Sequence, residues 1–168
     1  MSFHDKHIPI RRLFINGLKL VSSVGISHII HCCQHSLKIL ECAYMDQEIL
    51  NGAFCQSLSM CFILEELDLT GCSNVGDDGI NLLPKGEMKN EELRVMELIG
   101  LPKLRILKLG GMIKISDHPL LKLAQTSRVL EHLELTNCAL LTEYSIENII
   151  KQTPSLRFLD LNGIPAIT

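Results

Sequence analysis

One hydrophobic pattern recurs along almost the whole of this 168-residue chain. In LEELDLTGCSNVGDDGI, which begins at Leu64, the order L-x-x-L-x-L-x-x-C-x-x-V/I leads into a polar turn and Gly-Ile. The copies of this pattern begin at Ile10, Leu37, Leu64, Leu104, Leu130 and Leu156, so they are spaced by 27, 27, 40, 26 and 26 residues. A repeat of this length predicts a stack of similar coils, because no single coil can bury its own apolar edge.

Each copy opens with a short strand whose alternate residues face a core. These inward pairs are Leu13 and Ile15, Leu40 and Cys42, Leu67 and Leu69, Leu107 and Leu109, Leu133 and Leu135, and Leu159 and Leu161. A further buried position follows each strand, at Leu18, Met45, Cys72, Met112, Cys138 and Ile164. Three residues later stands a second apolar column, Val21, Val75, Ile115, Leu141 and Ile167, which Glu48 interrupts.

A helix is expected after each strand, because a turn rich in Ser, Thr, Asp or Gly comes next and its side-chain oxygens can cap a helix start. The helices bury one stripe, predicted as Ile26, Ile29, Ile30 and Cys33 in the first coil, and as Ile146, Ile149, Ile150 and Thr153 in the fifth. We therefore predict an α/β leucine-rich repeat solenoid, a horseshoe with six parallel strands on its concave face and helices on its convex face. The strands should be centred near residues 13, 40, 67, 107, 133 and 159.

The domain organisation follows from the repeats. Residues 1–9 form a lead-in, and residues 10–168 form a single leucine-rich repeat domain with an insertion near 81–93. Pro84 and Gly86 break the third helix, and a replacement helix is expected over roughly 92–100. Insertions in solenoids can be binding elements, although most surface insertions are tolerated without a function.

Composition limits the class of protein. No apolar run approaches the ~20 residues that cross a bilayer, and the segment MSFHDKHIPIRR lacks the apolar stretch of a secretory signal. The seven cysteines, an odd number, fall mostly at buried positions, which indicates reduced thiols and a cytoplasmic or nuclear protein. A net charge of -3 and a pI near 6.1 argue against nucleic acid as a partner.

The G-C-x-x-V/I segment and the acidic turn before Gly-Ile resemble the cysteine-containing repeats of F-box/leucine-rich-repeat proteins. The most faithful copies are LEELDLTGCSNVGDDGI and LEHLELTNCALLTEYSI, in which Cys72 and Cys138 hold the signature cysteine. The resemblance covers roughly residues 10–168. It implies a protein-interaction module that recruits substrates to an F-box-type ubiquitin ligase.

Such a ligase subunit carries an F-box segment ahead of its repeats, and the His7-Ile8-Pro9-Ile10 segment does not match the Leu-Pro-x-Glu opening of an F-box. Two interpretations stay open. The chain is either the substrate-recognition region of a longer ligase subunit, or a structural solenoid in a large intracellular assembly, for example a ciliary or organellar one. Polar end caps are not visible at either end of the repeats, so we expect further chain or a docked subunit there.

The residues of each strand that point away from the core are the candidate partner site. The residues predicted to form this site on the concave face are Phe14, Ile39, Glu41, Glu66, Asp68, Ile106, Lys108, His132, Glu134, Phe158 and Asp160. A third outward column holds Asn16, Ala43, Thr70, Gly110, Thr136 and Asn162. Because carboxylates outnumber Lys108 and large apolar groups accompany them, we expect a protein partner that is basic and partly apolar. The alternative is that these residues are ordinary polar surface.

Catalytic and metal-binding signals are weak. The string HIIHCCQH places His28, His31, Cys32 and His35 on one helix face, with ligand types that zinc favours. Four ligands in a line along a helix cannot surround one ion, and a solvent-facing stripe is an ordinary place for histidine. The sequence shows no phosphate loop, no G-x-S-x-G and no HExxH motif. We therefore predict no enzyme activity, no metal and no cofactor.

Overall fold

The computed structural model describes residues 7–45, 52–73 and 101–167. Within them, six short strands form one parallel sheet in which each strand pairs with the next in the chain. The strands are β1 (Arg12–Phe14), β2 (Ile39–Glu41), β3 (Glu66–Asp68), β4 (Ile106–Lys108), β5 (His132–Glu134) and β6 (Phe158–Asp160). All six are centred where the repeat predicts them, which confirms an α/β fold with a six-stranded parallel sheet.

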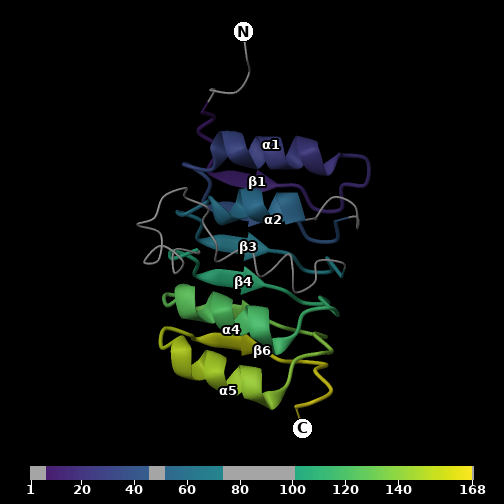
Figure 1. The fold of residues 1–168 in the computed structure, drawn as a ribbon, viewed down its shortest axis with the longest axis vertical. Helices are drawn as coiled ribbons and strands as arrows, with labels where there is room; N and C mark the ends of the chain where they lie inside the picture. Colours follow the sequence, from purple (N-terminus) through teal and green to yellow (C-terminus); the bar gives the residue numbers. More distant parts are fainter. Residues whose placement is uncertain (1–6, 46–51, 74–100, 168) are drawn as a thin grey trace, which may run out of the picture.

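Four helices are described, and they cover one face of the sheet (Figure 1). They are α1 (Ser23–Cys33), α2 (Gly52–Ser59), α4 (Asp117–Thr126) and α5 (Glu143–Gln152). Helix α1 packs against α2, and α4 packs against α5. The coils therefore lie one after another along an elongated stack, with β1 and β6 as the outermost strands (Figure 1).

The register of the sheet follows the repeat across every interval. The central leucine of each strand pairs with that of the next, from Leu13 to Leu40, Leu67, Leu107, Leu133 and Leu159. The 40-residue interval between the third and fourth copies leaves this register unchanged, because Leu67 still pairs directly with Leu107. The insertion near 81–93, the helix expected over 92–100, Glu48, Val75 and the Asp77-Asp78 turn lie outside the described residues.

Charged side chains just ahead of the strands also join neighbouring coils. Arg105 makes two hydrogen bonds to Glu131, from Nη2 to Oε2 at 2.9 Å and from Nε to Oε1 at 3.2 Å. Lys38 pairs with Glu65 at the same place in the second and third coils. Both pairs are solvent-exposed, so they favour the observed register more than they stabilise the fold.

The core lies between the sheet and the helices. The inward residues of β2 to β5 are fully buried, whereas Leu13, Ile15, Leu159 and Leu161 in the end strands are partly buried. In α1 and α5, the predicted buried stripe is too wide by one residue. Ile29 is 39% exposed and Ile150 is 53% exposed, while Ile26 and Ile149 are buried. The reason is that each helix touches the sheet along a narrow line, which leaves one flank of the predicted stripe in water.

The turn after each strand places one residue in the left-handed region of the backbone. These residues are Gly17 (φ 65°), Tyr44 (φ 55°), Gly71 (φ 73°), Gly111 (φ 76°), Asn137 (φ 59°) and Gly163 (φ 71°). Glycine and asparagine adopt this conformation at little cost, so five of the six positions carry a suitable residue. Tyr44 is the exception.

The two signature cysteines join neighbouring coils through the backbone. The Cys72 thiol donates to the carbonyl oxygen of Cys42 at 3.1 Å, and the Cys138 thiol donates to that of Leu109 at 3.2 Å. Burial raises the pKa of both thiols to about 11. These cysteines are therefore protonated at neutral pH and act as small buried donors.

The helix caps differ between the first and fifth coils. Ser22 caps α1 as predicted, because its hydroxyl accepts from the Gly25 amide at 3.1 Å. The prediction is wrong for Thr142, which stands ahead of α5 but makes no side-chain bond to its own helix. Its hydroxyl donates instead to Asp117 of the preceding coil. The Thr142 side chain therefore bonds to the Asp117 carboxylate of α4 and does not cap α5.

Candidate functional site

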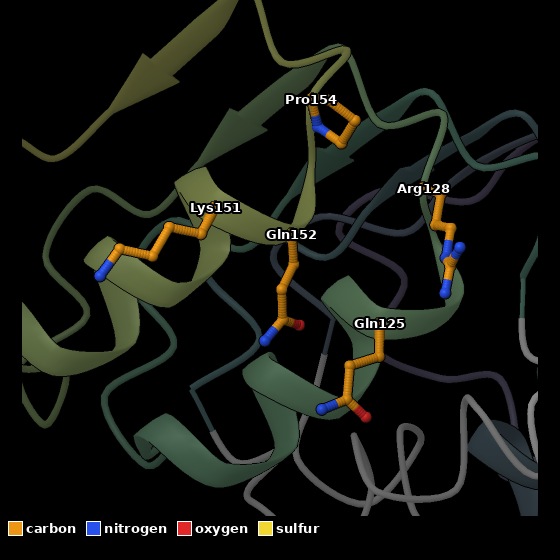
Figure 2. A pocket seen from close by; sticks show the side chains of 5 residues that line it. All are labelled: Gln125, Arg128, Lys151, Gln152 and Pro154. Atoms are coloured by element: carbon orange, nitrogen blue, oxygen red, sulfur yellow. The ribbon is translucent and has the colours of Figure 1, made fainter.

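A hollow of about 450 Å³ lies on the helix side of the stack, between the carboxyl ends of α4 and α5. It is lined by Gln125, Arg128, Lys151, Gln152 and Pro154. Gln152 reaches toward Gln125, and Lys151 points away from both (Figure 2) and pairs with Glu147 at 3.2 Å. Two neutral amides with a single nearby guanidinium do not make a catalytic or metal centre, so we do not assign this hollow a function.

The His/Cys stripe of α1 does not form a metal site. Among the residues that the structure describes, no three His, Cys, Asp or Glu side chains lie close enough together to hold an ion. The Cys32 sulfur lies 3.7 Å from His28 Nε2, and the ring of His35 lies 5.9 Å from that of His7 instead. The stripe therefore divides into separate local contacts along the helix.

The opposite face of the sheet carries the predicted partner residues. All eleven are at least partly exposed, and none belongs to the buried core. Together with Arg12 of β1, they form two adjoining columns across the six strands, one from Arg12 to Phe158 and the other from Phe14 to Asp160. We call this surface the open sheet face, because the described helices cover the other side.

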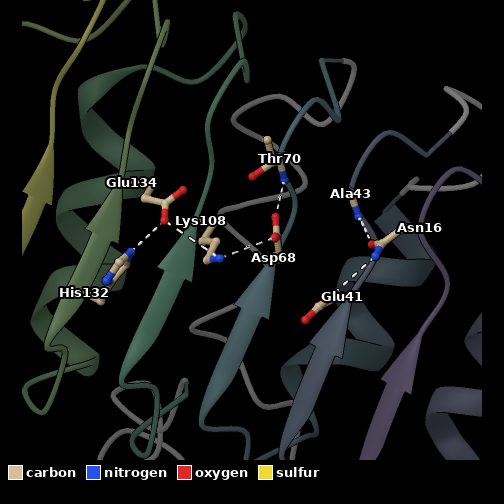
Figure 3. A network of polar contacts seen from close by, with 8 residues as sticks. All are labelled: Asn16, Glu41, Ala43, Asp68, Thr70, Lys108, His132 and Glu134. Atoms are coloured by element: carbon tan, nitrogen blue, oxygen red, sulfur yellow. Dashed lines mark hydrogen bonds and ion pairs between the residues drawn. The ribbon is translucent and has the colours of Figure 1, made fainter.

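A chain of polar contacts crosses the middle of the open sheet face (Figure 3). Lys108 lies between two carboxylates, 4.0 Å from Asp68 and 3.8 Å from Glu134. Glu134 also meets His132 Nε2 at 2.7 Å, while an Asp68 oxygen accepts from the Thr70 amide at 2.9 Å. The central lysine thus balances part of the acidic column, which leaves a negative lobe on each side of it.

The negative lobes differ in their neighbours. On the β2 and β3 side, Glu41 Oε2 accepts a hydrogen bond from the side-chain Nδ2 of Asn16 at 3.2 Å, and Glu66 lies on the next strand. On the β6 side, Asp160 accepts from the Asn162 amide at 2.9 Å. Each carboxylate keeps free acceptor capacity toward solvent, because a carboxylate can accept several hydrogen bonds.

Aromatic groups stand at both ends of the open sheet face. Phe158 stacks on His132 with ring centroids 4.1 Å apart and an interplanar angle of 11°. It remains 47% exposed, and Phe14 on β1 is 56% exposed. Exposed aromatic rings beside carboxylates combine apolar contact area with acceptors for a cationic partner group.

The third outward column is a correction to the sequence analysis. Ala43 and Gly110 are buried, although the strand alternation predicts them to be open to a ligand. A Cβ atom on Gly110 would lie 3.6 Å from the Thr70 methyl and 3.6 Å from the Thr136 carbonyl oxygen. Thr70 and Thr136 of the adjacent coils therefore cover Gly110 at the carboxyl end of its strand.

Tyr44 is a candidate site residue that the alternation does not reveal. It follows the third outward column, in the turn after β2, and it is 68% exposed. Comparing the copies would have found it, since the equivalent positions are glycine or asparagine.

These features define an α/β repeat protein with an open, acidic and partly aromatic sheet face. None of the helices in the described ranges is long and apolar enough to cross a membrane. No family model and no curated protein matches the chain. Among solved structures, the crystal structure of the Rad7 and Elc1 complex in yeast contains a similar chain, with 19% sequence identity and a TM-score of 0.60. The match covers 88% of this chain but 41% of that one, and at this identity it shows the fold alone.

Proposed function

We propose that this chain is a protein-interaction module, a leucine-rich repeat solenoid that binds a basic and partly apolar segment of another protein on its open sheet face. The observation that carries the proposal is the composition of that face. Carboxylates on β2, β3, β5 and β6 surround a single lysine, and exposed aromatic rings flank them. A cationic, apolar segment complements both features.

The biological role that fits best is substrate recognition in an F-box-type ubiquitin ligase of the cytoplasm or nucleus. The repeats that contain Cys72 and Cys138 support this assignment through their resemblance to that family. The likeness of fold to a chain in the Rad7 and Elc1 complex is consistent with a protein that works within an assembly. We propose no enzymatic activity, no cofactor, no nucleic-acid binding and no membrane insertion for this chain.

A second candidate is a structural solenoid subunit of a large intracellular assembly. The observation that favours it is the incomplete burial of the end coils, where Leu20 and Val24 are highly exposed and Leu159 and Leu161 are partly exposed. A docked subunit or further chain would cover these groups. Association of this kind would be mainly apolar and insensitive to salt.

A peptide selection tests the proposed binding chemistry. The immobilised chain would be used to select from a phage library of random 12-residue peptides, and the enriched peptides would then be synthesised. We expect enrichment of arginine or lysine together with apolar residues, and affinities that weaken as salt rises. Enrichment of neutral or acidic peptides, or no enrichment at all, would contradict the proposal.

Co-purification from the native source followed by mass spectrometry tests the biological role. A stoichiometric adaptor and cullin subunit would support the ligase assignment. A stable complex that contains neither would contradict it and favour the structural subunit.

A further inference from the structure

Tyr44 holds a backbone conformation that its residue type disfavours. Its φ of 55° lies in the left-handed region, where a side chain with a Cβ atom crowds the following carbonyl oxygen. The five equivalent residues of the other coils are glycine or asparagine. The fold at this position therefore does not require a tyrosine, and it would be less strained with a glycine.

The packing of the Tyr44 ring does not explain why this residue is a tyrosine either. The ring lies against Gly71 of the next coil, so closely that a Cβ atom on Gly71 would be 2.4 Å from Tyr44 Cδ1 and 2.6 Å from Cε1. The residue nevertheless remains 68% exposed, so the contact with Gly71 buries little of it. A strained residue with an exposed ring is characteristic of a binding position, where strain is retained for function.

The backbone that carries the ring is fixed by hydrogen bonds, and Gly71 limits the ring on one side. Gly71 leaves room on one side of the ring, and the backbone amide of Tyr44 donates to the Thr70 carbonyl oxygen at 2.7 Å. The Ala43 amide, one residue earlier, donates to Asn16 Oδ1 at 2.8 Å. A tyrosine positioned in this way loses little conformational entropy when a partner binds, which is why such residues contribute strongly to binding.

The charges on the neighbouring strands indicate what the ring would meet. The outward residues of β2 and β3 include three carboxylates, Glu41, Glu66 and Asp68, and no cation. Lys108 on β4 lies beside Asp68 at one end of the lobe, and Arg12 on β1 stands at the other end, so three carboxylates face two cations. A cationic side chain is therefore drawn to this lobe, and a tyrosine face is a favourable place for it.

We propose that Tyr44 is the anchor of the partner site, at which an arginine of the partner's basic segment stacks on the exposed part of the ring while its charge faces the carboxylates of β2 and β3. This inference rests on the proposed function and adds a specific contact to it. Arginine suits the position better than lysine, because its planar guanidinium stacks on rings and still donates to carboxylates.

The test uses the selected basic peptides and two substitutions at this position. We expect Tyr44→Gly to weaken peptide binding about tenfold or more, while the melting temperature stays the same or rises because the strain is relieved. Tyr44→Phe should bind within about twofold of the parent, since it keeps the ring face. Unchanged affinity in Tyr44→Gly would overturn the proposal, as would an equal loss in Tyr44→Phe.

A matched pair of glycine substitutions separates the effect of the ring's position on peptide binding from the effect of backbone strain. Gly71→Ala and Gly111→Ala replace glycines of nearly equal φ, 73° and 76°, but only the first places a Cβ atom against the Tyr44 ring. We expect Gly71→Ala to weaken peptide binding more than Gly111→Ala does, with circular dichroism checking that both variants are folded. Equal affinities would show that the position of the ring does not matter.

The partner's side of the contact is tested in the peptide. Replacing each arginine of a selected peptide in turn with glutamine should identify one whose loss weakens binding to the parent chain but not to Tyr44→Gly. If no arginine shows this coupling, the anchor proposal fails. If the peptides respond to charge reversal on β3 and β5 but not to Tyr44, the proposed function stands without the anchor. If peptide binding changes neither with charge reversal on β3 and β5 nor with substitution of Tyr44, both the anchor proposal and the proposed function fail.

Discussion

The carboxylate of Asp117, the first residue of α4, holds the residue that precedes the helix of the next coil. Its Oδ1 accepts the backbone amide of Thr142 at 2.9 Å, and its Oδ2 accepts the Thr142 hydroxyl at 2.6 Å. Because Thr142 is the N-cap of α5, this pair fixes where the helix begins and joins two coils on the helix side of the sheet.

Removing this contact should destabilise the protein modestly. We expect Asp117→Ala and Thr142→Ala each to lower the free energy of unfolding by about 1 kcal/mol or less, because the site is largely solvated. The double variant should lose less than the sum of the two, since both substitutions remove one interaction. Urea unfolding measures all three. Fully additive losses would show that the two residues do not interact.

The same contact predicts a pH dependence. Burial acts to raise the pKa of Asp117, but hydrogen bonding by Thr142, assisted by Ser145, outweighs it, so the pKa lies below its ordinary value. A lowered folded-state pKa gives stability that is present above the unfolded-state pKa of about 4 and is lost as the pH falls through the folded-state value. The stability difference between the parent and Asp117→Ala should therefore be larger at pH 7 than at pH 3. An equal difference at both would contradict this account.

Inward and outward strand residues should respond very differently to substitution. Leu135 is fully buried, so Leu135→Asp places an unpaired carboxylate in the core and should cost several kcal/mol. Its neighbour Glu134 faces solvent, and Glu134→Ala should cost about 0.5 kcal/mol or less despite its contacts with Lys108 and His132. Thermal melting of the two variants checks this. Equal shifts would mean that the inward and outward assignments are wrong.

The cysteines should differ in reactivity. Burial raises the pKa of Cys55 and Cys61 to about 12, and Cys72 and Cys138 are raised to about 11, whereas Cys32 is partly exposed on α1. Because the thiolate is the reactive form, iodoacetamide at pH 7.5 should label Cys32 well before the other six. Mass spectrometry of the native and urea-unfolded protein measures the order. Rapid native labelling of Cys72 or Cys138 would contradict their buried, hydrogen-bonded placement.

The sequence predicts the sheet well because every coil repeats the same local choice. Alternation places Leu40, Leu67 and Leu107 inward, and each copy supports the register of the next. The cap of α5 could not be predicted in this way, since it depends on Asp117 from another coil. The exposure of Ile29 and Ile150 also depends on the line of contact between helix and sheet, which periodicity along one helix does not define.

The candidate site was predicted less completely. Strand alternation identifies Glu41, Asp68 and Glu134 as outward residues, but it does not show that Lys108 lies between two of them. That arrangement depends on which strands are neighbours across the 40-residue interval. Tyr44 was missed because it lies in a turn, where the period of two ends and backbone conformation becomes the informative property.

The most direct test of the central claim is the affinity of the selected basic peptides for two charge-reversed variants that change net charge equally. Asp68→Lys with Glu134→Lys alters the open sheet face, and Glu143→Lys with Glu147→Lys alters exposed positions on α5. All four side chains lie outside the core, so circular dichroism should be unchanged in both variants.

We expect the first variant to lose about tenfold or more in affinity and the salt dependence of binding to weaken, while the α5 variant binds nearly as the parent does. Equal effects in the two variants would mean that only net charge matters. Normal binding by the first variant, together with loss of binding when Ile164→Asp is made at the far end of the stack, would contradict a partner site on the open sheet face.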